Sequence, residues 1–182
     1  MQTLILGFII FFGVHTIPSL SIKRKLIDRL GKTAYLVLFS LFSAFGLGLI
    51  VYGKGHAGFI EIWSPPTWSR LAPLFIMWPV FILLSWAYLP CQMKKRLRHP
   101  MLFGVILFSF SHLIANGDLA SILLFGAFAL FSLLKVVNAR HQSKPSEILK
   151  KSFIWDFTGI VIGSVAYFLS LKFHQQIAGI AI

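Results

Sequence analysis

Six long apolar segments separated by short polar connections constrain this chain more than any other feature. They occupy residues 1–20, 33–53, 71–90, 101–117, 119–134 and 153–171. At about 1.5 Å of rise per residue, each is close to the length that an α-helix needs to cross roughly 30 Å of hydrocarbon. Lipid offers no hydrogen-bond partners to the backbone, so such segments must be helical. The sequence therefore predicts an all-α, polytopic transmembrane bundle of about six helices, with residues 1–182 forming a single integral membrane domain.

Basic side chains alternate along the predicted connections. The formal net charge is +12, with 17 Lys and Arg residues against 5 Asp and Glu residues. Positive charge is abundant in the first, third and fifth connections, sparse in the second and absent from the fourth. Because cytoplasmic loops carry the excess of Lys and Arg, the alternation predicts those three connections in the cytoplasm and both termini outside. The same distribution argues against a nucleic-acid partner, since the charge is not gathered on one soluble face. Membrane lipid is the expected surrounding.

Two polar stretches are expected at the outer face. Residues 54–70 have a composition typical of a rigid turn with aromatic rings at headgroup depth, which fits either an interfacial anchor or a lid over a ligand. The residues that give this composition are Trp63, Pro65, Pro66 and Trp68. Asn116-Gly117-Asp118 interrupts the apolar stretch between the fourth and fifth segments. Asn-Gly and Gly-Asp steps favour a tight turn with positive φ, so we expect a short hairpin there, with a fourth helix of only about 17 residues.

Two further features are expected at the inner face. Cys91 adjoins the basic third connection and has no second cysteine with which to pair. An interfacial structural cysteine and an acylated cysteine are the two alternatives for it. Residues 138–151 are polar and basic, which favours a short helix along the inner surface.

Three ionisable residues lie within or beside the apolar segments, where an ionisable group costs about a few kcal/mol to insert. They are His15, His112 and Asp118. A histidine in a membrane helix can donate to a carbonyl or hydroxyl on a neighbouring helix, which gives it a structural role. Two imidazoles from different helices can instead hold a haem from opposite faces. The predicted depths of His15 and His112 differ by roughly 10 to 12 Å, which a tilted haem accommodates.

Three other residues are candidates for the same site. Asn116 follows His112 by four residues, so both occupy one face of a helix; Asn116 either orients the imidazole or caps the turn. Arg98 and His99 precede Pro100 at the start of the fourth segment. The free N–H groups and dipole of a helix N-terminus suit an anionic group there, while membrane topology and lipid headgroup binding are the alternative roles.

Four short motifs are spaced along the chain. They are Gly13-x-His15, Pro65-Pro66-x-Trp68, Arg98-His99-Pro100 and His112-Leu113-x-x-Asn116-Gly117-Asp118. In order and spacing they resemble the NnrU family of bacterial membrane proteins. The resemblance implies a multi-pass protein of the bacterial inner (cytoplasmic) membrane, associated with denitrification through nitrite and nitric oxide reduction.

The NnrU family is also similar to plant 15-cis-zeta-carotene isomerase, a membrane enzyme that binds haem b. This resemblance implies that His15 and His112 match the haem histidines of the isomerase. The isomerase has a cysteine three residues before the second histidine, whereas this chain has Ser109. An exchange of iron ligand at that position is therefore not carried over, and ligation by two histidines or by one remains.

Three hypotheses for function follow. The first is a haem-b-binding membrane protein that acts in redox or isomerase-type chemistry on a small or lipophilic substrate. Its metal ligands would be His15 and His112, and its other cofactor-binding residues Asn116, Arg98 and His99. The second is a non-enzymatic accessory protein for assembly or maintenance of a respiratory reductase. The third is a membrane methyltransferase, because Arg98-His99-Pro100-x-x-x-Gly104 is distantly similar to the isoprenylcysteine type, in which this run helps bind S-adenosylmethionine; Leu102 stands at its aromatic position.

Overall fold

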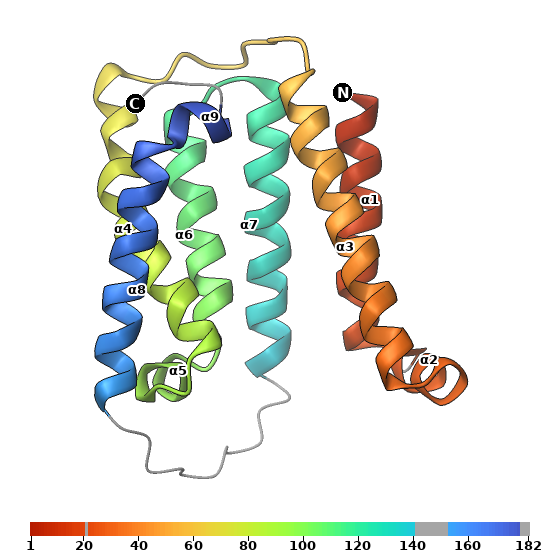
Figure 1. The fold of residues 1–182 in the computed structure, drawn as a ribbon. Coiled ribbons are helices and arrows are strands. Elements are labelled where there is room, and N and C mark those ends of the chain that lie inside the picture. Colours follow the sequence, from red (N-terminus) through yellow and green to blue (C-terminus); the bar gives the residue numbers. More distant parts are fainter. Residues whose placement is uncertain (21, 141–152, 179–182) are drawn as a thin grey trace. The chain divides into compact units, whose positions relative to one another are not determined.

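The described part of the chain is helical, as the apolar segments predict. The computed structural model describes residues 1–20, 22–140 and 153–178 (Figure 1). The long helices are α1 Gln2–Thr16, α3 Lys32–Gly55, α4 Leu71–Tyr88, α6 Pro100–Ala115, α7 Leu119–Arg140 and α8 Phe153–Lys172. Short helices are α2 Ile22–Leu30, α5 Gln92–Leu97 and α9 His174–Ala178, with 3-10 turns η1 Ile17–Ser19 and η2 Thr67–Arg70. Within these ranges the only β-structure is an isolated bridge.

The helices agree with the predicted membrane spans. Five of them, some extended by a 3-10 turn, have the length and composition to cross a membrane, and α6 is a shorter apolar helix. The 16 residues of α6 confirm the short fourth helix that the hairpin motif predicts. The protein is therefore an all-α, multi-pass membrane protein. The placement of both termini on the outer, non-cytoplasmic side stays a prediction.

One helix boundary was predicted wrongly. The fifth apolar segment ends near residue 134, but α7 continues to Arg140. A helix can run on past the hydrocarbon because its backbone hydrogen bonds continue and long basic side chains can lie along apolar neighbours. The Lys135 ammonium lies 5.2 Å from the ring centre of Phe131. Residues 138–140 thus belong to α7, and the rest of the helix expected over 138–151 lies outside the described residues.

The chain divides into two compact units, Met1–Ile60 and Glu61–Ile182, and each is described by itself. In the first unit, α1 packs antiparallel on α3. Glycines allow this close approach: a Cβ at Gly7 would lie 2.7 Å from the Ile50 nitrogen, and one at Gly46 would lie 2.9 Å from the Phe11 nitrogen. The packing sets His15 beside α3.

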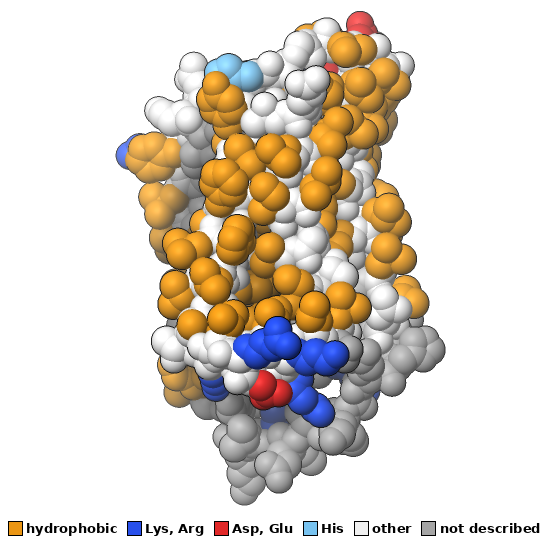
Figure 2. All heavy atoms as spheres, turned by 90° about the vertical axis from the view of Figure 1, so that its right-hand side faces the viewer, with side chains coloured by type: hydrophobic (Ala, Val, Ile, Leu, Met, Phe, Trp, Pro, Cys, Tyr) orange, Lys and Arg blue, Asp and Glu red, His pale blue; other side chains and the backbone are white. Residues whose placement is uncertain are grey.

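The ends of the apolar helices carry the positive charge that the sequence analysis expects. Helix α2 is strongly amphipathic, with exposed Lys23, Arg24, Lys25 and Arg29. On the face that Figure 2 shows, hydrophobic side chains form a broad band and Lys and Arg side chains gather at one end of it. Such a pattern is typical of a lipid-facing surface bordered by a headgroup region.

In the second unit, four long helices pack side by side in the order α8, α4, α6, α7. Helices α4 and α8 run antiparallel and approach closely at Gly163, where a Cβ would lie 2.6 Å from the Ile82 Cα. Two long-range hydrogen bonds join the same helices, from the Tyr167 hydroxyl to the Leu74 carbonyl at 2.6 Å and from the Trp78 indole to the Ser164 hydroxyl at 3.0 Å. This pair supports α6 and its neighbour α7, which carry the candidate site.

Candidate functional site

The His112 imidazole lies in the last turn of α6, with its orientation fixed by its own helix. Its Nδ1 is 2.8 Å from the Phe108 carbonyl oxygen and 3.2 Å from the Ser111 hydroxyl. A carbonyl only accepts, so Nδ1 carries the proton and donates to Phe108. In the neutral ring, Nε2 then carries the lone pair, which is the form that binds a metal. Among the described residues, no hydrogen bond involves Nε2 of His112.

Two phenylalanine rings pack against this imidazole. The Phe108 ring centre lies 4.4 Å from that of His112, and the Phe125 ring of α7 lies 4.7 Å away. The two phenylalanines are 5.5 Å apart in an edge-to-face arrangement. The structural role expected for a membrane histidine, a hydrogen bond to a neighbouring helix, is not what His112 shows: its hydrogen bonds stay on α6, and α7 contributes an apolar ring. We call His112, Phe108 and Phe125 the His112 cluster.

His15 repeats this arrangement in the first unit. Its Nδ1 is 2.8 Å from the Phe11 carbonyl oxygen, one turn earlier on α1. The imidazole stacks on Phe11 at 4.1 Å and contacts Phe39 of α3 at 5.2 Å. Both predicted ligands therefore share an aromatic ring four residues before them and a second one from the adjacent helix.

His56 shows which part of this arrangement is generic. It also has Nδ1 2.9 Å from the carbonyl oxygen of an aromatic residue one turn earlier, Tyr52, and stacks on that ring at 4.0 Å. His56 is exposed, however, and within the described residues no ring from another helix packs on it. The hydrogen bond alone is thus common to histidines in these helices, whereas the second ring distinguishes His15 and His112.

Asn116 caps the end of α6. Its backbone N–H donates to the His112 carbonyl at 3.0 Å, and its side-chain amide donates to the same oxygen at 2.8 Å. Of the two expected roles, the structure shows capping: the amide nitrogen contacts the backbone of His112 and not its ring. Asn116 nevertheless lies at the same end of α6 as the His112 cluster.

The turn after α6 forms differently from the prediction. Gly117 does not have positive φ; among the described residues only Arg98 and Gly31 do. Gly117 is instead needed for space, because its carbonyl accepts from the Ile62 N–H at 2.9 Å and an added Cβ would collide with the Trp63 carbonyl oxygen. The aromatic loop after residue 60 therefore docks on the turn, and Glu61 pairs with Asp118 in the isolated bridge.

Asp118 has a structural reason to be buried. Its carboxylate accepts from the Ser121 N–H at 3.0 Å in the first turn of α7, and the residue is only 7% exposed. We expect Asp118→Ala to remove this cap and destabilise the fold by about 1 kcal/mol. Asp118→Asn, which keeps an accepting oxygen, should retain most of it. Thermal unfolding in detergent measures both; equal losses for the two variants would contradict the capping role.

Arg98 and His99 lie at the other end of α6 from His112. Arg98 has φ 62 and ψ −47 and forms a γ-turn, in which the His99 N–H donates to the Leu97 carbonyl at 2.7 Å. His99 is the N-cap residue of α6, with no hydrogen bond from its side chain to the helix end. Thirteen positions of helix, about 20 Å at its usual rise, separate His99 from His112. The structure therefore brings Asn116 to the His112 cluster and leaves Arg98 and His99 apart from it.

The burial of two polar residues was not predicted from the sequence. The Ser109 hydroxyl is fully buried with no hydrogen-bond partner among the described residues, one turn before His112. Asp156 is 8% exposed; its carboxylate accepts from the Met93 N–H at 3.0 Å, and its carbonyl accepts from the Trp86 indole at 3.0 Å. Asp156 is the one acid of the sixth apolar segment, which was the available signal. Its contacts with α4 and α5 give it a structural role.

The comparisons with known proteins identify one family. The model of the family described as NnrU protein matches residues 3–182, nearly the whole chain. No curated protein and no solved structure matches the chain.

Proposed function

Since this chain belongs to the NnrU family, as the match over residues 3–182 shows, we propose that it binds haem b through His112. The observation that carries the proposal is the state of the imidazole. Nδ1 donates to the Phe108 carbonyl, and Phe108 and Phe125 hold the ring in place. A ring held in this way presents an unprotonated Nε2 without reorganisation, as histidine ligands of metals do.

The residues around His112 have the apolar character that a haem site needs. Phe108 and Phe125 supply apolar rings, and the Ser109 hydroxyl is a buried polar atom without a partner among the described residues. In the described ranges, His, Cys, Asp and Glu do not gather in groups of three or more. A metal whose other ligands come from a macrocycle needs only one or two protein side chains. His15, with the same hydrogen bond and two packed rings, stays the predicted second ligand.

Haem bound here would supply one-electron chemistry or an iron site for a small ligand. The residues of the chain would orient the iron through His112, exclude water with the phenylalanine rings and hold the end of α6 through Asn116. We propose that the protein acts in the bacterial inner membrane, in redox or isomerase-type chemistry linked to nitrite and nitric oxide reduction. The resemblance to a haem-binding isomerase supports this reading.

The test is the absorption spectrum of the full-length protein purified in detergent from haem-replete cells, oxidised and reduced. We expect a Soret band that shifts on reduction, with haem near one equivalent per chain by extraction. A colourless, haem-free preparation would contradict the proposal. The accessory-protein and methyltransferase hypotheses stay predictions. The accessory-protein hypothesis requires that deletion of the gene lowers the activity of the reductase. The methyltransferase hypothesis requires saturable binding of S-adenosylmethionine, which Arg98→Ala weakens.

A further inference from the structure

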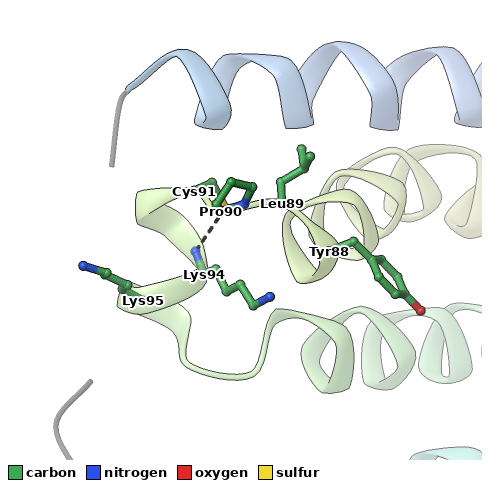
Figure 3. Close-up of a pocket in the computed structure, with 6 residues that line it drawn as sticks. All are labelled: Tyr88, Leu89, Pro90, Cys91, Lys94 and Lys95. Carbon is green, nitrogen blue, oxygen red and sulfur yellow. Dashed lines mark hydrogen bonds between the residues drawn. The ribbon is translucent and has the colours of Figure 1, made fainter. Parts of the chain in front are cut away.

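Two adjoining hollows lie where α4 ends and turns into α5. The first, of about 210 Å³, is lined by Tyr88, Leu89, Pro90, Cys91, Lys94 and Lys95 (Figure 3). The second, of about 320 Å³, lies between α4 and α8. Tyr88 and Leu89 line both. The two hollows are therefore neighbouring parts of one surface depression in the second unit.

The two hollows differ in chemistry. The first has two lysines on its wall, at the connection that the charge pattern assigns to the cytoplasmic face. The second is lined almost wholly by apolar side chains, including Phe81 and Leu84 of α4 and Ile162 and Ala166 of α8. The lining residues of α4 extend from Phe81 to Tyr88, which corresponds to about 10 Å along the helix. A cationic end thus continues into an apolar groove that follows the helix axes.

Hydrogen bonds tie the corner that carries the lysines to its neighbours. Cys91 is buried, and its thiol accepts from the Lys94 N–H at 3.4 Å, which caps the start of α5. The Met93 N–H donates to the Asp156 carboxylate, so α5 is also tied to α8. In Figure 3 the Lys94 side chain extends toward Tyr88, whereas Lys95 points away from it. Of the two alternatives for Cys91, these contacts favour the structural cysteine. Of the two lysines, Lys94 is the one whose side chain lies along the depression.

We propose that this depression binds an anionic phospholipid, with its phosphate at Lys94 and one acyl chain in the groove between α4 and α8. The match is one of charge and shape: an ammonium at the headgroup level, a phenol beside it and an open apolar groove along α4 and α8. Basic pockets between transmembrane helices on the cytoplasmic side recognise anionic headgroups by the same chemistry. A zwitterionic lipid fills the groove but gains little from Lys94.

The test is native mass spectrometry. The full-length protein in detergent is titrated with phosphatidylglycerol or phosphatidylcholine, and the fraction of protein that keeps a bound lipid after release from the micelle is measured. We expect the wild-type chain to retain phosphatidylglycerol preferentially. Lys94→Gln should weaken retention of phosphatidylglycerol about fivefold, the size expected for one lysine near an anionic surface. Arg96→Gln removes the same charge from an exposed residue of α5 that does not line the depression, and should change retention less than about twofold.

A second variant tests the apolar part. Ala166→Phe fills the groove without a change of charge and should weaken retention of both lipids by similar factors. Equal retention of the two lipids by the wild type, or equal effects of Lys94→Gln and Arg96→Gln, would overturn the assignment of Lys94. Unchanged retention in a folded Ala166→Phe protein would overturn the assignment of the groove. Lys94 is exposed, so the Gln variant folds and decides the question even where the Phe variant does not.

Discussion

Replacing His112 with alanine is expected to remove the Soret band of the purified protein and to lower its haem content at least about tenfold. The variant lacks the nitrogen that would hold the iron, and the Phe108 and Phe125 side chains offer no other. Phe108 and Phe125 remain, so the apolar surroundings of the site persist in the variant. Haem extraction and the reduced-minus-oxidised spectrum measure the loss.

His56→Ala is the matched control for this experiment. His56 has the same hydrogen bond to a carbonyl four residues earlier and the same stacked aromatic ring, but it is exposed at the end of α3. Its replacement should leave haem content and spectrum unchanged. His15→Ala, measured in the same way, tests the predicted second ligand: loss of the Soret band would support that prediction, and an unchanged spectrum would contradict it. Full haem content in His112→Ala would refute ligation by this residue.

The arrangement of the spans could be predicted because it depends on hydropathy and charge, which are summed along the sequence and do not require knowledge of tertiary contacts. Apolar length and loop charge locate the helices to within a few residues, and the short α6 followed from Asn116-Gly117-Asp118. The end of α7 could not be placed by hydropathy, because the helix continues where its side chains become polar. Backbone hydrogen bonding carries the helix on to Arg140, and the Lys135 ammonium lies over the ring of Phe131.

The candidate site was predictable in its residue types and only partly in its contacts. Sequence spacing placed Asn116 on the same helix face as His112; the structure has Asn116 just past the helix in extended backbone, where its amide donates to the His112 carbonyl. Sequence spacing could not show Phe125 against the imidazole, because that contact depends on the register between α6 and α7. Nor could it show the positive φ of Arg98, which no glycine marks, or the lone hydroxyl of Ser109. The Phe125 contact and the burial of Ser109 depend on tertiary packing, and the φ of Arg98 depends on the local turn between α5 and α6.

Gly117→Val is expected to destabilise the protein by about 3 kcal/mol or more, because the new side chain has no space. The Cβ would meet the Trp63 carbonyl oxygen and lie 2.9 Å from the Pro65 ring. The carbonyl is part of a backbone that is fixed by two hydrogen bonds to the Gly117 oxygen, from Ile62 and Trp63, so the loop must detach to admit the side chain. For a chain of this size, we expect the unfolding temperature in detergent to fall by roughly 6 to 12 °C.

Gly126→Ala separates this steric effect from the general effect of replacing a glycine. Gly126 lies within α7 in the same unit, and a Cβ there meets nothing within 4 Å. Alanine in a helix interior is more favourable than glycine by about 0.5 to 1 kcal/mol, so this variant should unfold at an equal or higher temperature. Opposite signs for the two variants would show that the aromatic loop holds the end of α6 in place. A Gly117→Val protein as stable as the wild type would mean that the loop is not docked on this turn, and that Asn116 and His112 owe their positions to α6 and α7 alone.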